Sequence, residues 1–323
     1  MAEQTINALD RVIHSVRGLD GRRVVVYVSD GLPMQPAAEI FQSYKPDEQL
    51  TEDVAVSRIS AQTQAFDAMN ANLNETYLQL ARRAALAGVQ FFAIDARGVQ
   101  GFDEDIESSA TSSHLDSSLI RSNLHGPIQL LADETGGQAI IDTNDMNLAF
   151  EKLDEHLSSY YSLGFLSEGT DREDDVSVTV KRRGLTARAV KHVRQRSTRE
   201  QLADRVRAGL YAHSDENPLD ARVALTPASG SVTATIRVPL QKLSIMPGEQ
   251  TSFTVLVAML DKEMRETAVR MFVHRVAPSE SQDSVQSLTL NAPPGTYVVS
   301  FAVADSYSSQ VSYFQQEVMI PGN

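Results

Sequence analysis

The stretch RRVVVYVSDG, residues 22–31, is an apolar, β-branched run that ends in a carboxylate and a glycine. Such a run predicts a buried central strand whose carboxyl end carries Asp30. A second run, VQFFAIDARG at residues 89–98, repeats the pattern after an intervening helical region and carries Asp95. Parallel strands end at a common edge of the sheet, where ligands bind in open α/β folds. We therefore expect Asp30 and Asp95 to share that edge.

The composition indicates a globular protein of two domains. The chain has 323 residues, more than one typical domain, and 42% of them are hydrophobic. A net charge of −13 argues against general binding to nucleic acid or to anionic membranes, because both are polyanions. Since the chain has no cysteine, disulfides, thiolate metal sites and cysteine nucleophiles are excluded. No window approaches the roughly 18 apolar residues of a membrane span, and the N-terminus lacks a signal-peptide pattern.

Helical and strand patterns alternate through residues 1–159. An amphipathic helix precedes the first strand, and further helices are expected before the second strand, at 128–135, and after the capping residue Asp145. A short strand is expected at 139–141. Since strand and helix follow each other in this way, the sequence predicts a doubly wound, Rossmann-like α/β domain.

The pattern changes after residue 159. Apolar and polar residues alternate in three stretches within 160–196, which predicts an antiparallel β extension of three strands. The capping box from Ser197 to Glu200 opens a helix within 197–217 that is expected to link the two halves. About seven short alternating stretches with Pro-Gly turns fill residues 218–323, and they predict an all-β, immunoglobulin-like sandwich.

Sequence motifs for catalysis are absent. The chain has no Gly-x-Ser-x-Gly, no phosphate-binding Gly-x-x-x-x-Gly-Lys and no dinucleotide-binding Gly-x-Gly-x-x-Gly. Its seven histidines are scattered, and each is expected to be a surface or internally satisfied residue. The basic stretch 181–207 has no aromatic interleaving, which favours a solvated face over a site for an acidic partner. We therefore expect no enzyme; a hydrolase acting through the acidic edge is the alternative.

Asp30 is the best candidate for a functional residue. An acidic side chain at the end of a central strand can hold a hard cation such as Mg²⁺, provided that neighbouring oxygens complete the coordination. Ser29 and Asp95 are the nearby candidates for these metal ligands, although Asp95 could instead cap a turn with Arg97. Residues 99–126 have no usable periodicity, and we expect a mobile loop at the ligand edge or a solvated insertion.

Several segments, taken in order, resemble a von Willebrand factor A domain, and more specifically the VWFA-related family of acidobacterial type. The segments that carry the resemblance are VVVYVSDG, YLQLARRAALAGV, QFFAIDARG, LLADETGGQAIIDTND, SSYYSLGF, VTVKRRGLTARAV, STREQLADRVRAGL and DENPL. They cover most of the chain in the family's order. The family also carries a β-sandwich after its A domain, which agrees with the strand pattern at 218–323.

The resemblance implies a non-enzymatic module for protein–protein interaction or adhesion, secreted or periplasmic, whose protein partner is unidentified. The family's metal-dependent adhesion site uses an Asp-x-Ser-x-Ser turn that this sequence lacks, and only Asp30 has a counterpart in it. The implied site is therefore degenerate. The family's first strand also has no counterpart, which leaves a sheet edge that another segment must cover. The second interpretation of the chain is a structural spacer that binds no metal and makes its contacts through the sandwich.

Overall fold

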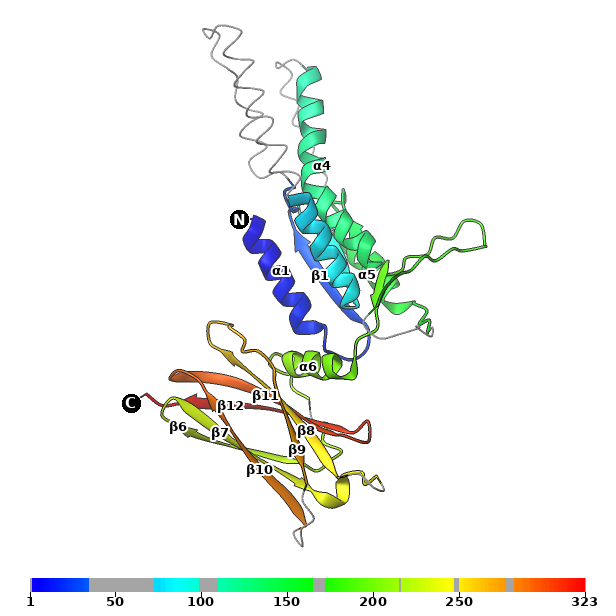
Figure 1. The fold of residues 1–323 in the computed structure, drawn as a ribbon. Coiled ribbons are helices and arrows are strands. Elements are labelled where there is room, and N and C mark those ends of the chain that lie inside the picture. Colours follow the sequence, from blue (N-terminus) through cyan, green and yellow to red (C-terminus); the bar gives the residue numbers. More distant parts are fainter. Residues whose placement is uncertain are drawn as a thin grey trace, which may run out of the picture. The chain divides into compact units, whose positions relative to one another are not determined.

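The computed structural model describes residues 2–34, 73–98, 110–164, 172–214, 216–246, 250–276 and 282–322. The chain forms two compact units, which are drawn in Figure 1. The first unit comprises Met1–Ile13 and Gly21–Gln195, and the second comprises His14–Asp20 and Arg196–Asn323. Within the described ranges, no helix combines the length and hydropathy of a membrane span.

A three-stranded parallel sheet forms the centre of the first unit. Its strands are β1 (Arg23–Ser29), β2 (Val89–Asp95) and β3 (Gln138–Ile140), in the order β1-β2-β3. Ser29 lies opposite Asp95 in the register of β1 and β2. The two apolar runs are therefore adjacent parallel strands that end at one edge, which confirms the mixed α/β prediction and the shared edge. The prediction that the first run is a buried central strand was wrong, because β1 is the terminal strand of the described sheet and its Val26 and Val28 are exposed.

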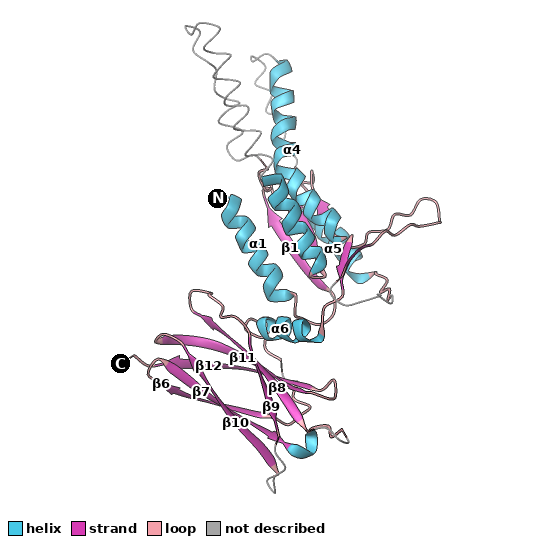
Figure 2. Ribbon diagram, viewed as in Figure 1, coloured by secondary structure: helices cyan, strands magenta, loops and turns pink. Residues whose placement is uncertain are grey.

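Four helical segments accompany this sheet (Figure 2). They are α1 (Ala2–Val16), a helix at 73–86, α4 (Ala110–Thr135) and α5 (Met146–Ser158). The prediction of a loop at 99–126 was wrong for 110–126, because α4 begins at Ala110; residues 99–109 lie outside the described part. This part of the helix was missed because the apolar residues of α4 do not gather on one face and Pro127 interrupts the pattern, so no apolar stripe reveals its period.

Helices lie against both faces of the sheet. On one face, the α5 residues Ala149 and Leu153 share a buried cluster with Phe92 and Ile94 of β2. On the other face, Tyr77 from the helix at 73–86 is fully buried. Burial, together with the neighbouring Tyr27 of β1, raises the pKa of Tyr77 to about 12. The sheet thus has a helix on each side, as expected of a parallel sheet.

The end of α4 approaches β2 closely. A Cβ added at Gly137 would lie 1.8 Å from the carbonyl oxygen of Phe91, so only glycine fits there. The hydroxyl of Thr135, at the last turn of α4, accepts a hydrogen bond from the amide of Phe91 at 2.9 Å. The Gly-Gly pair that the sequence marks as a helix stop therefore also brings the helix end onto the strand.

The β extension is smaller than predicted. Its ladder consists of β4 (Glu173–Asp175) and β5 (His192–Arg194), which pair antiparallel. Residues 159–164 and 176–191 are outside any strand, and 165–171 lie outside the described residues. The prediction of three strands was therefore wrong for the described part, because alternating apolar residues mark a strand only where a partner strand is present.

The second unit contains two antiparallel sheets. Its strands are β6 (Arg222–Ala228), β7 (Ser231–Pro239), β8 (Ser252–Asp261), β9 (Arg270–Arg275), β10 (Asp283–Asn291), β11 (Gly295–Asp305) and β12 (Val311–Ile320). One sheet has the order β10-β7-β6 and the other β12-β11-β8-β9. A single hydrophobic cluster contains residues of both sheets, including Ile236 and Phe301, so the sheets pack as a sandwich. Alternation in the sequence predicts this core because successive side chains point to opposite faces.

Helix α6 (Thr198–Ala208) packs on the outer face of the larger sheet. Val206 shares a buried cluster with Leu256 and Ala302 of β8 and β11. The predicted capping box is present: the Ser197 hydroxyl accepts from the amide of Glu200, and the Glu200 carboxylate accepts from the amide of Ser197. The helix start is therefore fixed by the side chains that the sequence indicated.

The close approach at Gly137 gives a direct test of the fold. We expect Gly137→Ala to destabilise the first unit by about 1–3 kcal/mol, because the added methyl group must displace the β2 backbone. Gly164→Ala is the matched control, since nothing lies within 4 Å of a Cβ placed there. Hydrogen exchange of the β2 amides in urea measures both variants. Equal protection in the two variants would show that α4 does not end against β2.

Candidate functional site

The carboxyl edge of β1 and β2 is the candidate site. The carbonyl oxygen of Ser29 accepts a hydrogen bond from the amide of Ala96 at 2.9 Å, so the ladder continues past the strand ends. Asp30 follows Ser29 directly and its side chain is exposed. Gly31 then adopts a φ of 106°, which favours glycine, and a Cβ there would lie 2.8 Å from that of Leu124. The turn after β1 thus presents the Asp30 carboxylate outward.

The segment after this turn is held by α4. Proline has no N–H, so Pro127 leaves the carbonyl of Asn123 without its usual helical donor. The amide of Met34 donates to this carbonyl at 3.0 Å, and the amide of Leu32 donates to the carbonyl of Leu124, also at 3.0 Å. The proline in α4 therefore makes an acceptor available to the segment that follows Asp30.

Asp95 lies beneath this edge in a buried polar contact. Its side chain is 1% exposed, and its Oδ2 lies 2.7 Å from Nε2 of His125, which is also buried. The backbone N–H of Arg97 donates to Oδ1 at 3.1 Å, and the Arg97 Nε lies 3.4 Å from the same oxygen. The predicted turn with Arg97 is confirmed, while the partner on α4, His125, was not predicted.

The environment of Asp95 favours its ionised form. Burial by itself would raise the pKa of Asp95. The hydrogen bonds from the Arg97 amide and from His125, together with the positive charge of Arg97, outweigh burial and hold the pKa below its usual range. Asp95 is therefore a charged group that ties the end of β2 to α4 through His125.

The three predicted metal ligands have different surroundings. Asp30 is exposed, the Ser29 Oγ accepts from the amide of Gly31 at 3.2 Å, and both oxygens of Asp95 accept hydrogen bonds. In the described part of the chain, no group of three or more acidic or histidine side chains could hold a metal ion. Mg²⁺ takes about six oxygen ligands, so a cation at Asp30 would need further ligands from other residues or from water.

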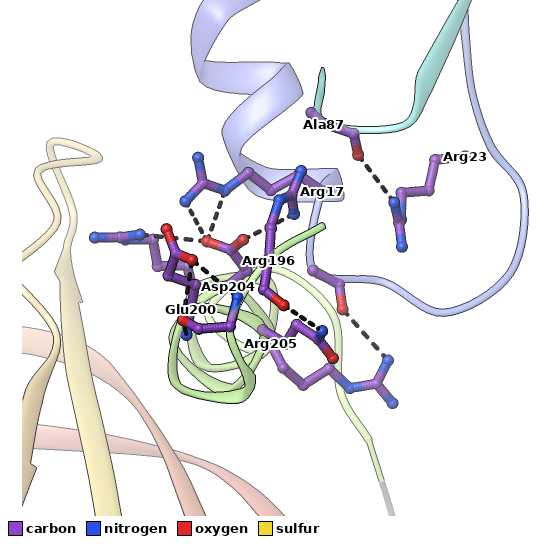
Figure 3. A network of polar contacts seen from close by, with 11 residues as sticks. Arg17, Arg23, Ala87, Arg196, Glu200, Asp204 and Arg205 are labelled. Carbon is purple, nitrogen blue, oxygen red and sulfur yellow. Dashed lines mark hydrogen bonds and ion pairs between the residues drawn. The ribbon is translucent and has the colours of Figure 1, made fainter. Parts of the chain in front are cut away.

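A second polar centre lies within the second unit, at α6 (Figure 3). The carboxylate of Asp204 is 3% exposed and accepts from Arg17 Nε at 2.7 Å and from Arg196 at 2.9 Å, while Arg207 lies 3.5 Å away. The basic stretch 181–207 was expected to be a solvated face; at Arg196 and Arg207 it is instead a partly buried cluster around one carboxylate. This cluster joins residue 17 to α6.

A cavity of about 250 Å³ lies beside the end of α6, within the second unit. Arg205 borders it, pairs with Asp20 at 2.5 Å and Glu216 at 3.3 Å, and places its guanidinium 5.1 Å from the ring centre of Tyr313. Burial raises the pKa of Tyr313. None of the residues predicted for the site lines this cavity, and its Arg205 is already paired with Glu216 and stacked on Tyr313.

The pKa of Asp95 predicts how stability depends on pH. Because the pKa of Asp95 is lower in the folded than in the unfolded state, its ionised form stabilises the fold at any pH above the unfolded-state pKa of about 3.9. This contribution is lost as the pH falls through the folded-state pKa. Calorimetric melting between pH 6 and pH 2 should therefore show a steeper loss for the natural chain than for Asp95→Asn. Asp133→Asn, at an exposed position of α4, is the control. Identical slopes for natural chain and Asp95→Asn would contradict the assignment.

The Asp204 cluster predicts a large effect of a single substitution. Asp204→Ala leaves three guanidinium groups without their shared carboxylate, and we expect it to destabilise the second unit by about 3–5 kcal/mol. Glu317→Ala, at an exposed position of β12, should change stability by less than about 0.5 kcal/mol. Urea unfolding followed by hydrogen exchange of β8 and β11 measures both. A mild effect of Asp204→Ala would mean that the cluster is solvated.

No family model and no curated protein sequence matches the chain. Among solved structures, a glycosyl hydrolase family 2 member from Bacteroides cellulosilyticus DSM 14838 is 14% identical over 31% of this chain and 14% of its own, with a TM-score of 0.21. A β-glucuronidase from Parabacteroides merdae is 11% identical over 31% of this chain and 13% of its own, with a TM-score of 0.20. The matched part spans about one seventh of these enzymes, and similarity of this degree assigns no function.

Proposed function

We propose that the chain is a non-enzymatic protein-interaction module, secreted or periplasmic, that presents the sheet edge around Asp30 to a protein partner. The observation that carries this proposal is the exposed carboxylate of Asp30 directly before a segment whose amides, at Leu32 and Met34, are bound by α4. An anchored main chain lowers the entropy cost of binding, because fewer conformations are lost when the partner docks.

We include the fold types of the two units in the same proposal. A parallel sheet with helices on both faces, a Ser29-Asp30-Gly31 turn after β1 and a β-sandwich that follows are features in which the chain resembles von Willebrand factor A proteins. On this basis we assign the first unit to a partial, Rossmann-like A domain and the sandwich to an immunoglobulin-like type. Interaction through the carboxyl edge of the sheet then follows the general rule for open α/β folds.

The same geometry assigns a role to each residue at the edge. Asp30 supplies a negative charge that can pair with a basic group of the partner, and the partner's desolvation strengthens this pair. Asp95 fixes the end of β2 through His125 and Arg97 and makes no contact with a partner. Since the oxygens of Ser29 and Asp95 accept protein hydrogen bonds, recognition by Asp30 does not require Mg²⁺.

A structural spacer is the second candidate, and the surroundings of Asp95 favour it. A carboxylate with both oxygens bound by protein donors serves stability more than recognition. In this reading the first unit only positions the β-sandwich, which makes the contacts. The two candidates differ in whether Asp30 matters for binding.

Partner capture with matched charge reversals tests the proposal. Immobilised natural chain should retain a partner from extracellular or periplasmic protein, and Asp30→Lys should abolish retention because the edge charge is inverted. Glu317→Lys makes the same charge change on β12 of the second unit and should retain the partner. Retention that survives Asp30→Lys but is lost with Glu317→Lys would support the spacer instead.

Calorimetric titration separates metal-dependent from metal-independent recognition. We expect no saturable heat when MgCl₂ or MnCl₂ is added to the chain, because the described edge residues do not assemble a ligand set. Saturable binding that disappears in Asp30→Ala would contradict this and would establish a functional adhesion site.

A further inference from the structure

The outer edge of β1 is open among the described residues. β1 is the terminal strand in the order β1-β2-β3, so its second edge has no described strand beside it. Val26 and Val28 point to one face of β1 and are 41% and 49% exposed. An apolar edge strand of this kind is a template for pairing with another strand.

The same unit carries a segment with the complementary features, residues 176–190, which we call the arm. Figure 1 shows it as a long green loop that leaves β4 and returns to β5. The amide of Val176 bonds the carbonyl of Lys191, and residues 177–190 belong to none of the strand ladders in the described part of the chain. Val178 and Val180 are 41% and 37% exposed. The arm is thus an unpaired strand sequence with an apolar face.

The arm and the edge match when they are aligned in parallel. Setting Val176 beside Val24 also sets Val178 beside Val26 and Val180 beside Val28. All of these valines then lie on one face, because side chains alternate with a period of two. A parallel strand in this position continues the parallel order of the existing sheet.

The charged residues of the arm and of β1 favour the parallel over the antiparallel alignment. In the parallel alignment, Arg182 of the arm falls beside Asp30, the exposed carboxylate at the end of β1. In an antiparallel alignment the basic tip at 181–183 would fall beside Arg22 and Arg23, and like charges placed side by side oppose pairing. The parallel register is therefore favoured at both its apolar and its charged positions.

The arm's own attachment prevents it from reaching β1 of the same chain. Lys191 is bound to Glu134 by its amide and by its Nζ, and a Cβ at Gly136 would touch Ala189, so the arm ends next to the beginning of β3. The arm also starts there, because the amide of Val176 bonds the carbonyl of Lys191. β2 separates β3 from β1, and neighbouring strands lie about 4.8 Å apart. Val176 is thus on the wrong side of the sheet to pair with its own Val24.

We propose that the occupant of the β1 edge is the arm of a second copy of this chain. Two copies exchange arms, and each arm adds a fourth parallel strand beside β1 of the other copy. The exchange covers the exposed valines of both segments and pairs Arg182 of one copy with Asp30 of the other. This inference goes beyond the proposed function, since it names a self-association rather than a different partner protein. Both use the carboxylate of Asp30, so Arg182 of the second copy and the partner compete for it.

Sedimentation velocity of the full chain across a range of concentrations tests the proposal. The natural chain should form a concentration-dependent dimer. Val178→Pro, which removes a ladder donor from the arm, and Val26→Lys, which places a charge on the edge, should each give monomer. Val285→Lys is the matched control, because Val285 on β10 of the second unit is 47% exposed, and its dimer should be unchanged.

A charge exchange tests the register. Asp30→Lys and Arg182→Glu should each raise the dimer dissociation constant by about tenfold or more, because like charges then meet in both copies of the interface. The double variant should restore the natural constant. Partner capture would still fail in the double variant, so this result is distinct from the proposed function. A natural chain that stays monomeric, or a dimer that tolerates Val178→Pro, would overturn the arm exchange.

Discussion

The contact between Asp95 and His125 is the interaction on which the candidate edge depends. It joins the end of β2 to α4, and α4 in turn binds the segment after Asp30 through the carbonyls of Asn123 and Leu124. A buried carboxylate is costly unless its oxygens are satisfied, and here the Arg97 amide and His125 satisfy them. The buried charge therefore has a positioning role, and Asp30 is left as the exposed carboxylate.

Pro127 provides a backbone acceptor close to the contact between Asp95 and His125. A proline within a helix removes one intrahelical hydrogen bond, which ordinarily destabilises the helix. In α4 the acceptor that is released by Pro127 is used by Met34, so the loss is offset by a contact between two segments that are distant in sequence. His125 lies two residues before the proline, in the turn where the helix meets the sheet edge. Pro127 therefore accounts both for the missing hydrogen bond in α4 and for the anchoring of the segment after Asp30.

Local patterns made much of the fold predictable. The two apolar runs gave β1, β2 and their common edge, the alternation after residue 218 gave the sandwich, and the Ser197 capping box gave the start of α6. Each of these depends on residues that are neighbours in sequence. The burial of Asp95 was not predictable, because its partner His125 is 30 positions away and belongs to a helix without an apolar stripe. The arm was wrongly predicted to be a strand, because its valines alternate as in a strand although no described strand pairs with them.

Hydrogen exchange at single amides shows whether α4 holds the segment after Asp30. The amides of Leu32 and Met34 donate to α4 carbonyls, so they should exchange as slowly as those in the middle of β2. Residue-resolved exchange by NMR can compare them within one sample. We expect slow exchange at both positions, and exchange at the rate of an unprotected chain would show that α4 does not hold this segment.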